Sequence, residues 1–273
     1  MANNTIFATK VIEAKAKDIL TTKINARSMM TIDDSLAQTA GMTKTINTYT
    51  YTGAAEEVAA GAGNATRGSI AYVGKDYTVK MIQQAFDYLD EDFMKDNVIV
   101  DMGLKGATSV MTNKMTADFY AALATTDGAS PNPKELVKNV TFAKGKEISY
   151  DVIVDAISEL NIEDEGKVFI IIPNTWKAAL RKDADYKSAH TGDVIYNGQV
   201  GVIVGIPVVA TKALTDKAYV LTNEAVTLFI KKDVEVEQDR DKDKRKNMIY
   251  LRDCYVCALT DATKCCKITE ATA

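Results

Sequence analysis

Two neighbouring stretches decide the fold class, IIIPNTWKAALRKDADY at residues 170–186 and GQVGVIVGIPVVATKAL at residues 198–214. The first begins inside the apolar run Val168–Ile172, which is typical of a strand buried on both faces. Pro173 ends that strand, and Asn174 or Thr175 is expected to cap the short helix that follows. In the second stretch, Gly205 separates two short strands. This order predicts a mixed helix-and-sheet unit in the middle of the chain.

Two further helices are predicted on either side of a linker. Residues 98–125 carry apolar side chains at every third or fourth position, the spacing of one buried helix face. That face consists of Leu104, Ala107, Met111, Met115, Phe119 and Ala122. Its Met and aromatic content would also suit a binding groove, but a core face is preferred because Met commonly fills gaps in cores. Pro131 and Pro133 mark the linker, and Ser149 is expected to cap the second helix.

An extended hairpin is predicted before the long helix. KTINTYTYT at residues 44–52 favours a strand, and KDYTVKM at residues 75–81 alternates as the returning strand. Between them lies the small-residue tip GAAEEVAAGAGNATRG at residues 53–68. An isolated two-stranded hairpin is only marginally stable in water, so it needs a surface to lie against. That surface is either a partner chain or another part of the same subunit.

The first 40 and the last fifty residues carry a helical pattern and a set of strand patterns, respectively. Residues 1–40 hold one modest helical pattern, and the charged residues from Lys10 to Arg27 give that part of the arm a net charge of +3. The helix is either solvated or part of an arm that lies on another surface. The final fifty residues read as strands interrupted by a mixed-sign run at 233–247. This run is either a solvated hairpin tip or an ion-pair contact between subunits.

Composition excludes several classes of function. The 273 residues contain 47% apolar and 26% charged residues, and 33 basic against 37 acidic side chains give a net charge of −4. This balance predicts an ordinary globular protein, too weakly charged for a dedicated nucleic-acid binder. The longest apolar run, 200–210, is about half a membrane span, and the first residues lack the apolar core of a signal peptide. We therefore expect no membrane association.

No catalytic constellation emerges from the motifs. His190 is the only histidine, which excludes a triad or a multi-histidine metal site that needs a second one. Phosphate-loop, dinucleotide-binding and nucleophile-elbow motifs are absent from the sequence. Glu163, Asp164 and Glu165 cluster in a predicted turn beside Gly166, which is a place for solvated charge. We predict no catalytic residue, no cofactor and no enzyme activity.

The four cysteines raise the question of a metal site. Cys254 and Cys257 form a C-x-x-C motif, and Cys265 and Cys266 follow it. Residues 249–259 alternate as a strand, so Cys254 and Cys257 are expected to point to opposite faces, away from any shared ion. Small buried side chains are the preferred interpretation over a zinc site, and no metal is predicted.

Taken together, the elements resemble the major capsid proteins of tailed bacteriophages, which have the Hong Kong 97-like fold. The resemblance spans nearly the whole chain and is strongest in the two stretches quoted first, where a strand ending in Pro precedes a helix and a G-x-x-G-x-x-x-G-x-P-V hairpin from Gly198 to Val208. The later AVTLFIKKDVEVEQDRD, at 225–241, is similar to the closing sheet of that family. The resemblance implies an α+β fold.

The resemblance also implies a division of the chain. Residues 1–40 correspond to an N-terminal arm and 41–82 to an extended β-hairpin loop. Residues 83–133 form a peripheral domain with a long spine helix, 134–220 an axial α/β domain with 182–198 near the capsomer axis, and 221–273 the remaining peripheral strands and C-terminal segment. The arm leaves no room for a cleaved scaffold segment before it. This implies a separate scaffolding protein or none.

The implied function is a capsid protein of the virion, assembled in the host cytoplasm. It would form hexamers and pentamers in an icosahedral shell that holds double-stranded DNA non-specifically, with portal and decoration proteins as further partners. The residues expected at subunit contacts are Tyr49, Tyr51, Glu56, Glu57, Arg67, Lys75, Arg240, Asp241, Lys242, Asp243 and Arg245. Two alternatives are an encapsulin-type compartment around a cargo protein and a hydrolase that uses paired carboxylates.

Overall fold

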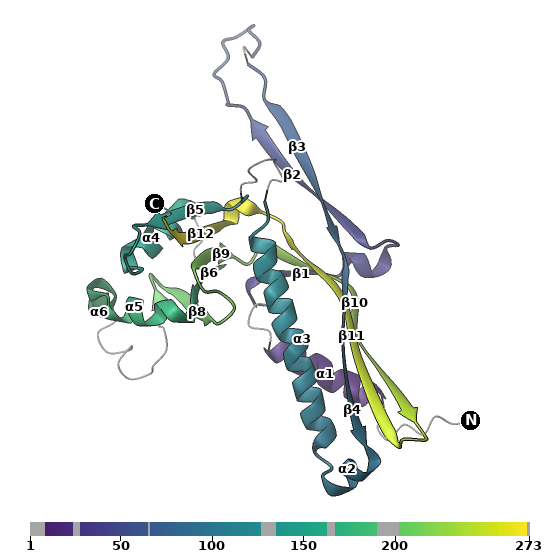
Figure 1. The fold of residues 1–273 in the computed structure, drawn as a ribbon. Helices are drawn as coiled ribbons and strands as arrows, with labels where there is room; N and C mark the ends of the chain where they lie inside the picture. The colour runs from purple at the N-terminus through teal and green to yellow at the C-terminus, as the bar shows by residue number, and fades with distance from the viewer. Residues whose placement is uncertain are drawn as a thin grey trace.

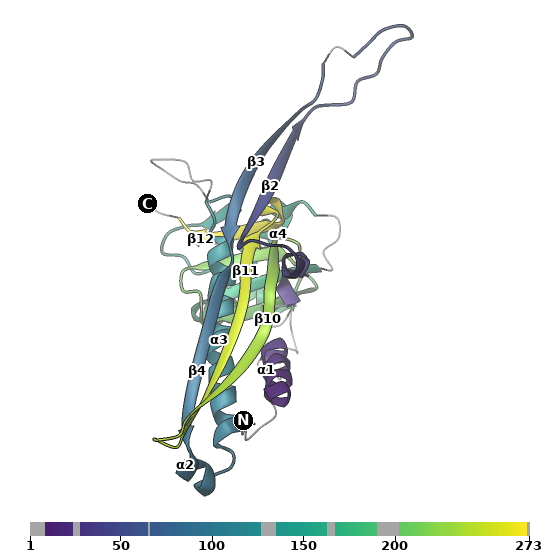
Figure 2. The same ribbon diagram turned by 90° about the vertical axis from the view of Figure 1, so that its right-hand side faces the viewer.

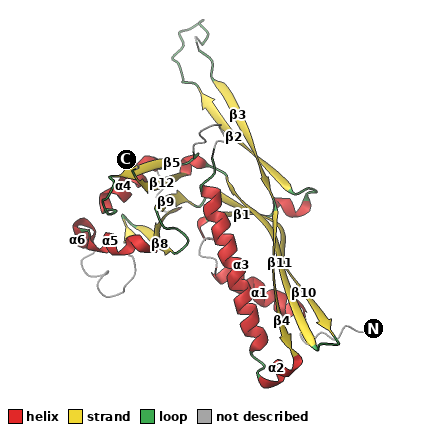
Figure 3. Cartoon of the chain, viewed as in Figure 1, coloured by secondary structure: helices red, strands yellow, loops and turns green. Residues whose placement is uncertain are grey.

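The computed structural model describes residues 9–23, 28–64, 66–126, 135–162, 167–189 and 202–271. Figure 1 shows two sheets with a long helix between them and a two-stranded ribbon that projects away from both. The same elements coloured by type in Figure 3 make the mixture of helix and strand plain. This confirms the predicted α+β class. No helix in the described ranges is both long and apolar enough to cross a membrane.

The first sheet has four strands in the order β1-β10-β11-β4. These are β1 (Thr31–Asp33), β10 (Val226–Asp241), β11 (Lys246–Leu259) and β4 (Lys80–Leu89). Figure 2 shows the long strands running along α3 (Ile99–Leu123), with α1 (Thr9–Lys23) at the side. The short helix α2 (Asp90–Lys95) joins β4 to α3. One large apolar core lies between α1, α3 and this sheet.

Helix α3 confirms the predicted long helix and its buried face. All six predicted core residues, from Leu104 to Ala122, are buried. Gly103 has a specific packing reason, because a Cβ there would collide with the ring of Phe86 on β4. The predicted face therefore packs against the sheet as its periodicity requires.

The second sheet has six strands in the order β5-β12-β9-β6-β8-β7. These are β5 (Lys138–Phe142), β12 (Cys265–Glu270), β9 (Lys217–Thr222), β6 (Val168–Pro173), β8 (Ile206–Thr211) and β7 (Val202–Ile203). Ile170, Ile171 and Ile172 are fully buried, which confirms the predicted central strand. Gly205, at φ +80°, lies in the turn between β7 and β8, so that prediction is confirmed too.

Helix α4 (Tyr150–Leu160) packs on this second sheet, and η4 (Asn174–Trp176), α5 (Lys177–Lys182) and α6 (Ala184–Ala189) follow β6. Ser149 occupies the predicted N-cap position of α4, but its side chain makes no capping hydrogen bond, and the Tyr150 N–H donates to Asp183 Oδ2 at 2.7 Å. The predicted cap at Asn174 or Thr175 is wrong. Asn174 and Thr175 lie inside η4, where the Thr175 hydroxyl donates to the Thr215 carbonyl at 3.3 Å.

The C-terminal strand belongs to the second sheet. β10 and β11 lie in the four-stranded sheet, whereas β12 pairs with β5 and β9 in the six-stranded sheet. The chain changes sheets at η5 (Ala262–Lys264), where Asp261 accepts a hydrogen bond from the Thr263 N–H. This exchange of strands ties the two sheets together.

The helix of the N-terminal arm lies on its own subunit. Ile12 and Ala16 of α1 are buried in the main core. Lys15 Nζ lies 3.0 Å from Asp101 Oδ1 of α3, and Lys17 forms an ion pair with Asp233 of β10. The basic side chains that suggested an arm over another surface are thus partly neutralised within the chain.

The ribbon consists of β2 (Thr43–Thr52) and β3 (Ser69–Thr78), paired from Thr43↔Thr78 to Thr52↔Ser69. This confirms the predicted hairpin. Among the described residues no third strand pairs with either of its strands. The turn η2 (Ser35–Gln38) lies near its base, and the chain passes from β3 directly into β4. Met81, predicted on the returning strand, therefore belongs to the first sheet.

Candidate interaction surface

The base of the ribbon is anchored to the body of the subunit on one face. Ile46 and Tyr77 pack against a small core that contains Val79 and Phe229. Lys44 Nζ lies 5.0 Å from the centre of the Phe229 ring, within the range of a cation–π contact. Side chains of a strand alternate between its two faces, so a ribbon that rests on a support with one face is anchored through every second residue.

Lys75 contributes to this anchor. Its Nζ donates to the Thr126 carbonyl at the end of α3, at 2.8 Å, and the Tyr77 hydroxyl donates to the Leu259 carbonyl at 3.3 Å. Burial raises the pKa of the Tyr77 hydroxyl, so it stays a proton donor. Lys75 was predicted at a subunit contact; in the single subunit it serves the root of the ribbon.

The outer half of the ribbon is exposed. Tyr51 and Ile70 face each other in the register, and Tyr72 follows Ile70 by two residues, so the three share one face. Their exposed fractions are 66%, 69% and 70%. Tyr49 lies opposite Tyr72 in the register, and its side chain is outside what the structure describes. A row of large apolar side chains in water is the mark of a surface that docks on something.

The tip beyond the strands is organised by two local contacts. Glu56 accepts hydrogen bonds from the N–H of Thr66, at 3.1 Å, and from its hydroxyl. The Tyr51 ring lies over Gly53 and Gly68, where any Cβ would collide with it. The tip is thus closed by a carboxylate and a ring, while Glu57 and Arg67 are exposed.

The charged tip lies at the far end of β10 and β11. Arg240 Nη2 lies 2.6 Å from Asp90 Oδ2, and Asn247 Nδ2 donates to Asp90 Oδ1 at 2.7 Å. Arg245 pairs with Glu91 at 2.7 Å, and Asp241 accepts from the backbone N–H of Asp243 and Lys244. This confirms a hairpin tip.

The predicted contact residues of this tip fall into two groups. Arg240, Asp241 and Arg245 are engaged within the subunit, whereas Lys242 and Asp243 are exposed at the turn. The structure therefore gathers the eleven predicted residues into two separate places, the ribbon and this tip. It does not bring the two places together (Figure 1).

Two important carboxylates were missed from the sequence. Asp90, which organises the charged tip, belongs to a run of acidic residues with no pattern of its own. Asp118 is buried on the inner face of α3. Its signal was visible, because it falls three residues after Met115 and four before Ala122 on the predicted apolar face.

The cysteines are free thiols buried in the cores. Cys254 packs in the small core at the ribbon base and Cys257 in the main core, so the predicted opposite orientation is confirmed. Burial raises the pKa of Cys257 to about 12 and that of Cys266 to about 11. In the described ranges no group of three or more metal-ligating side chains gathers. His190, Glu163, Asp164, Glu165, Gly198 and Gly201 lie outside the described residues.

Comparisons with known proteins identify the fold. The capsid of Ralstonia phage GP4 matches with a TM-score of 0.65 at 9% identity, over 91% of this chain and 89% of that chain. The capsid of cyanophage P-SCSP1u matches with a TM-score of 0.64 at 12% identity, over 90% and 87%. A virus-like particle from Pyrococcus furiosus matches with a TM-score of 0.63 at 10% identity, over 95% and 98%.

No protein-family model and no curated protein matches the sequence. The three structural matches nevertheless cover 90–95% of this chain. The chain therefore has the Hong Kong 97-like fold of tailed-phage capsids, as its sequence pattern predicted.

Proposed function

We propose that this chain is a major capsid protein. Copies of it associate as hexamers and pentamers in an icosahedral shell around the double-stranded DNA of a tailed phage. The shell forms in the host cytoplasm and becomes part of the virion. The observation that carries the proposal is the ribbon, whose outer half exposes Tyr51, Ile70 and Tyr72. A neighbouring subunit is the natural support for a ribbon that is marginal alone.

The proposed contact residues follow from the described side chains and, for Tyr49, from its place opposite Tyr72 in the register. Tyr49, Tyr51, Glu57 and Arg67 on the ribbon, with Lys242 and Asp243 on the charged tip, are proposed to contact neighbouring subunits. Five residues support these contacts indirectly, because their hydrogen bonds and ion pairs within the subunit hold the ribbon and the charged tip in shape: Glu56, Lys75, Arg240, Asp241 and Arg245. Many modest contacts repeated around a shell give strength through multivalency.

Partners other than the chain itself follow from the same function. The net charge of −4 suits a container that encloses DNA without gripping particular sequences. A scaffolding protein, a portal and decoration proteins are further partners of such a shell. No enzyme activity is part of the proposal.

An encapsulin-type compartment is the second candidate, because the Pyrococcus furiosus virus-like particle covers 95% of this chain. Such a shell would enclose a cargo protein in place of DNA. Both candidates share the fold and the subunit contacts, so the contents of the particle separate them.

The test is to purify the full chain, alone and from cells that produce it naturally, and to image it by negative-stain electron microscopy. Closed shells with nuclease-protected DNA are expected. Shells that hold a second protein and no DNA would favour the compartment. A stable monomer from both sources would contradict both and reopen the hydrolase alternative.

A further inference from the structure

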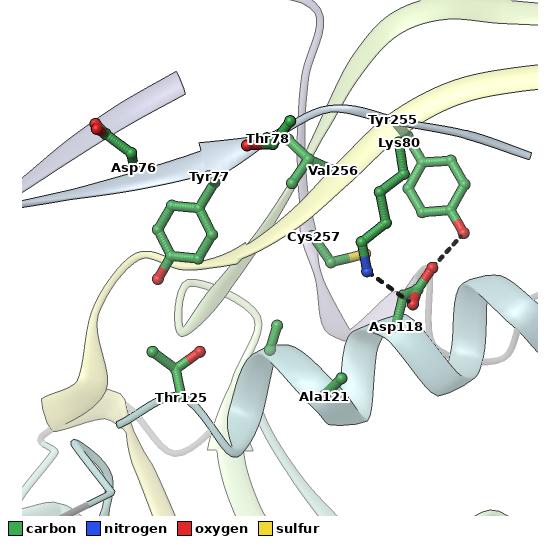
Figure 4. A pocket seen from close by; sticks show the side chains of 11 residues that line it. Asp76, Tyr77, Thr78, Lys80, Asp118, Ala121, Thr125, Tyr255, Val256 and Cys257 are labelled. Atoms are coloured by element: carbon green, nitrogen blue, oxygen red, sulfur yellow. Dashed lines mark hydrogen bonds and ion pairs between the residues drawn. The ribbon is translucent and has the colours of Figure 1, made fainter. Parts of the chain in front are cut away.

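A hollow of about 280 Å³ lies under the root of the ribbon, between β3, β4, β11 and the end of α3 (Figure 4). Tyr77, Lys80, Tyr255 and Cys257 line it from the strands, and Asp118 reaches into it from the helix. The hollow therefore sits at the junction where the ribbon meets the body of the subunit.

Asp118 is the one carboxylate in the lining that is deeply buried, with 8% of its surface exposed. Its Oδ1 atom lies 3.3 Å from Lys80 Nζ and 3.3 Å from Lys114 Nζ, and its Oδ2 atom accepts a hydrogen bond from the Tyr255 hydroxyl at 2.9 Å. A buried carboxylate is costly unless it keeps a positive partner, and this one has two on the same oxygen.

The two lysines connect different parts of the molecule. Lys114 lies one turn away from Asp118 on α3, so its ion pair is internal to the helix. Lys80 is the first residue of β4, two residues after β3 ends at Thr78, so its ion pair joins the ribbon junction to α3. Their side chains are equally exposed, at 57% for Lys80 and 56% for Lys114.

Between ribbon and sheet, Val79 provides a fixed point. Its side chain is buried in the small core, and its N–H donates to the Met42 carbonyl at 2.7 Å. On either side of Val79, the Tyr77 hydroxyl of β3 donates to the Leu259 carbonyl and Lys80 of β4 pairs with Asp118.

We propose that the Lys80–Asp118 ion pair is a releasable latch that sets the angle of the ribbon, with Asp118 as its positioning residue. Lys114 makes release inexpensive, because the buried carboxylate keeps one cation and the Tyr255 hydrogen bond when Lys80 leaves. The ribbon can therefore adjust its angle to neighbours in different positions of a shell. In that role the latch rests on the proposed function, but its effect on the angle belongs to the single subunit.

The test compares two matched variants of the full chain before assembly. Lys80→Met and Lys114→Met each remove one cation from the same oxygen of Asp118. Spin labels are placed through Thr52→Cys on the ribbon and Asn113→Cys on α3, both exposed positions. Pulsed electron paramagnetic resonance then gives the distribution of distances between the labels.

The distribution is expected to broaden and shift in Lys80→Met and to match the parent in Lys114→Met. Lys80→Arg, which keeps the charge, is expected to restore the parent distribution. Equal broadening in both Met variants, or no change in Lys80→Met, would overturn the latch. Because the measurement uses unassembled subunits, a broadened Lys80→Met in a protein that never forms shells would support the latch while contradicting the proposed function.

Discussion

The chain contains two long antiparallel strand pairs, here called the buried ribbon (β10 and β11) and the exposed ribbon (β2 and β3), which differ in how much of their surface the subunit covers. β10 and β11 pair over more than a dozen residues, with β1 and β4 as their neighbours in the sheet and α3 packed on one face. Their buried side chains include Val234, Val236, Ile249 and Leu251. β2 and β3 pair over ten residues each, and beyond their anchored base their described side chains are exposed. Figure 2 shows β10 and β11 lying along α3, whereas β2 and β3 project away from the rest of the subunit.

The difference lies in what covers each ribbon. Both sequences are rich in residues that favour strands, but only the first alternates long apolar side chains toward a helix of the same chain. The outer half of the second has no such cover within the described subunit, and it places Tyr51, Tyr72 and Ile70 in water. One ribbon is covered by its own subunit and the other is left uncovered. The uncovered ribbon is therefore available to associate with another surface.

The largest effect is expected from shortening the exposed ribbon. Deleting residues 48–73 joins Asn47 to Gly74, an Asn-Gly pair that suits a two-residue hairpin turn, and it keeps the anchored base. We expect the free energy of unfolding to stay within about 1 kcal/mol of the parent, because little buried surface is lost. Closed shells should be absent from electron micrographs.

Normal shells from this deletion would show that the outer ribbon is not needed for assembly. A deletion that also prevents cooperative thermal unfolding would show that the ribbon belongs to the core of the subunit. Either result would break the contrast between the two ribbons.

A truncation in the buried ribbon should act on the subunit itself. Leu251→Ala removes a side chain that is fully buried against the main core. We expect a loss of about 2–5 kcal/mol in the free energy of unfolding, measured by denaturant titration. A loss below about 0.5 kcal/mol would mean that β11 is not packed as described.

Alkaline pH should lower the free energy of unfolding through groups on the buried ribbon. Burial, reinforced by the nearby Asp118 carboxylate, raises the pKa of the Tyr255 hydroxyl, and burial raises that of Cys257 to about 12. These groups stay protonated in the folded chain, whereas in the unfolded chain they ionise near their ordinary values of 10.0 and 9.0. The stabilising contribution of these protonated groups is therefore fully present below about pH 9 and decreases as the pH rises further.

The urea midpoint, followed by circular dichroism, should be level from pH 7 to 8.5 and fall steadily from pH 9 to 11. Thiol reagents should modify the four cysteines slowly at pH 8 and rapidly after unfolding. A midpoint that is unchanged at pH 11 would contradict the burial of these side chains.

The smallest effect on the subunit is expected in the exposed ribbon. Ile70→Thr keeps a β-branched side chain at a position that is 69% exposed. The free energy of unfolding should change by less than about 0.5 kcal/mol. The yield of closed shells should fall, measured by sedimentation, because an apolar contact on a neighbour is lost. An unchanged yield would remove Ile70 from the contact face.

The sequence predicted what local patterns determine. The apolar face of α3, the buried strand β6, the Gly205 turn and the hairpin all follow from the spacing of residues close in the chain. Ser149 stands at the predicted cap position of α4 without a side-chain cap, and the acceptor for the Tyr150 N–H comes from Asp183, 33 residues away, which no local pattern could indicate. The place of β12 depends on pairing with β5 and β9, which no local pattern specifies.

The contact residues of the interaction surface stay predictions. The sequence drew attention to the tyrosines of the ribbon and to the charged run, because their composition is unusual for buried strands. The residues that bind the charged run within the subunit could not be found from the sequence. Asp90 and Arg240, for example, are 150 residues apart, and only the folded chain brings them together. Asp118 could have been found as an acidic residue on an apolar helix face.

The central claim is that a second copy of the chain covers the exposed ribbon, and hydroxyl-radical footprinting tests it most directly. Labelling of Tyr51, Ile70 and Tyr72 is measured in unassembled subunits and in assembled particles, with the buried Tyr255 as the reference. We expect strong labelling of the three residues in the subunit, marked protection in the particle and little labelling of Tyr255 in either. Equal labelling of the ribbon in both states would contradict it.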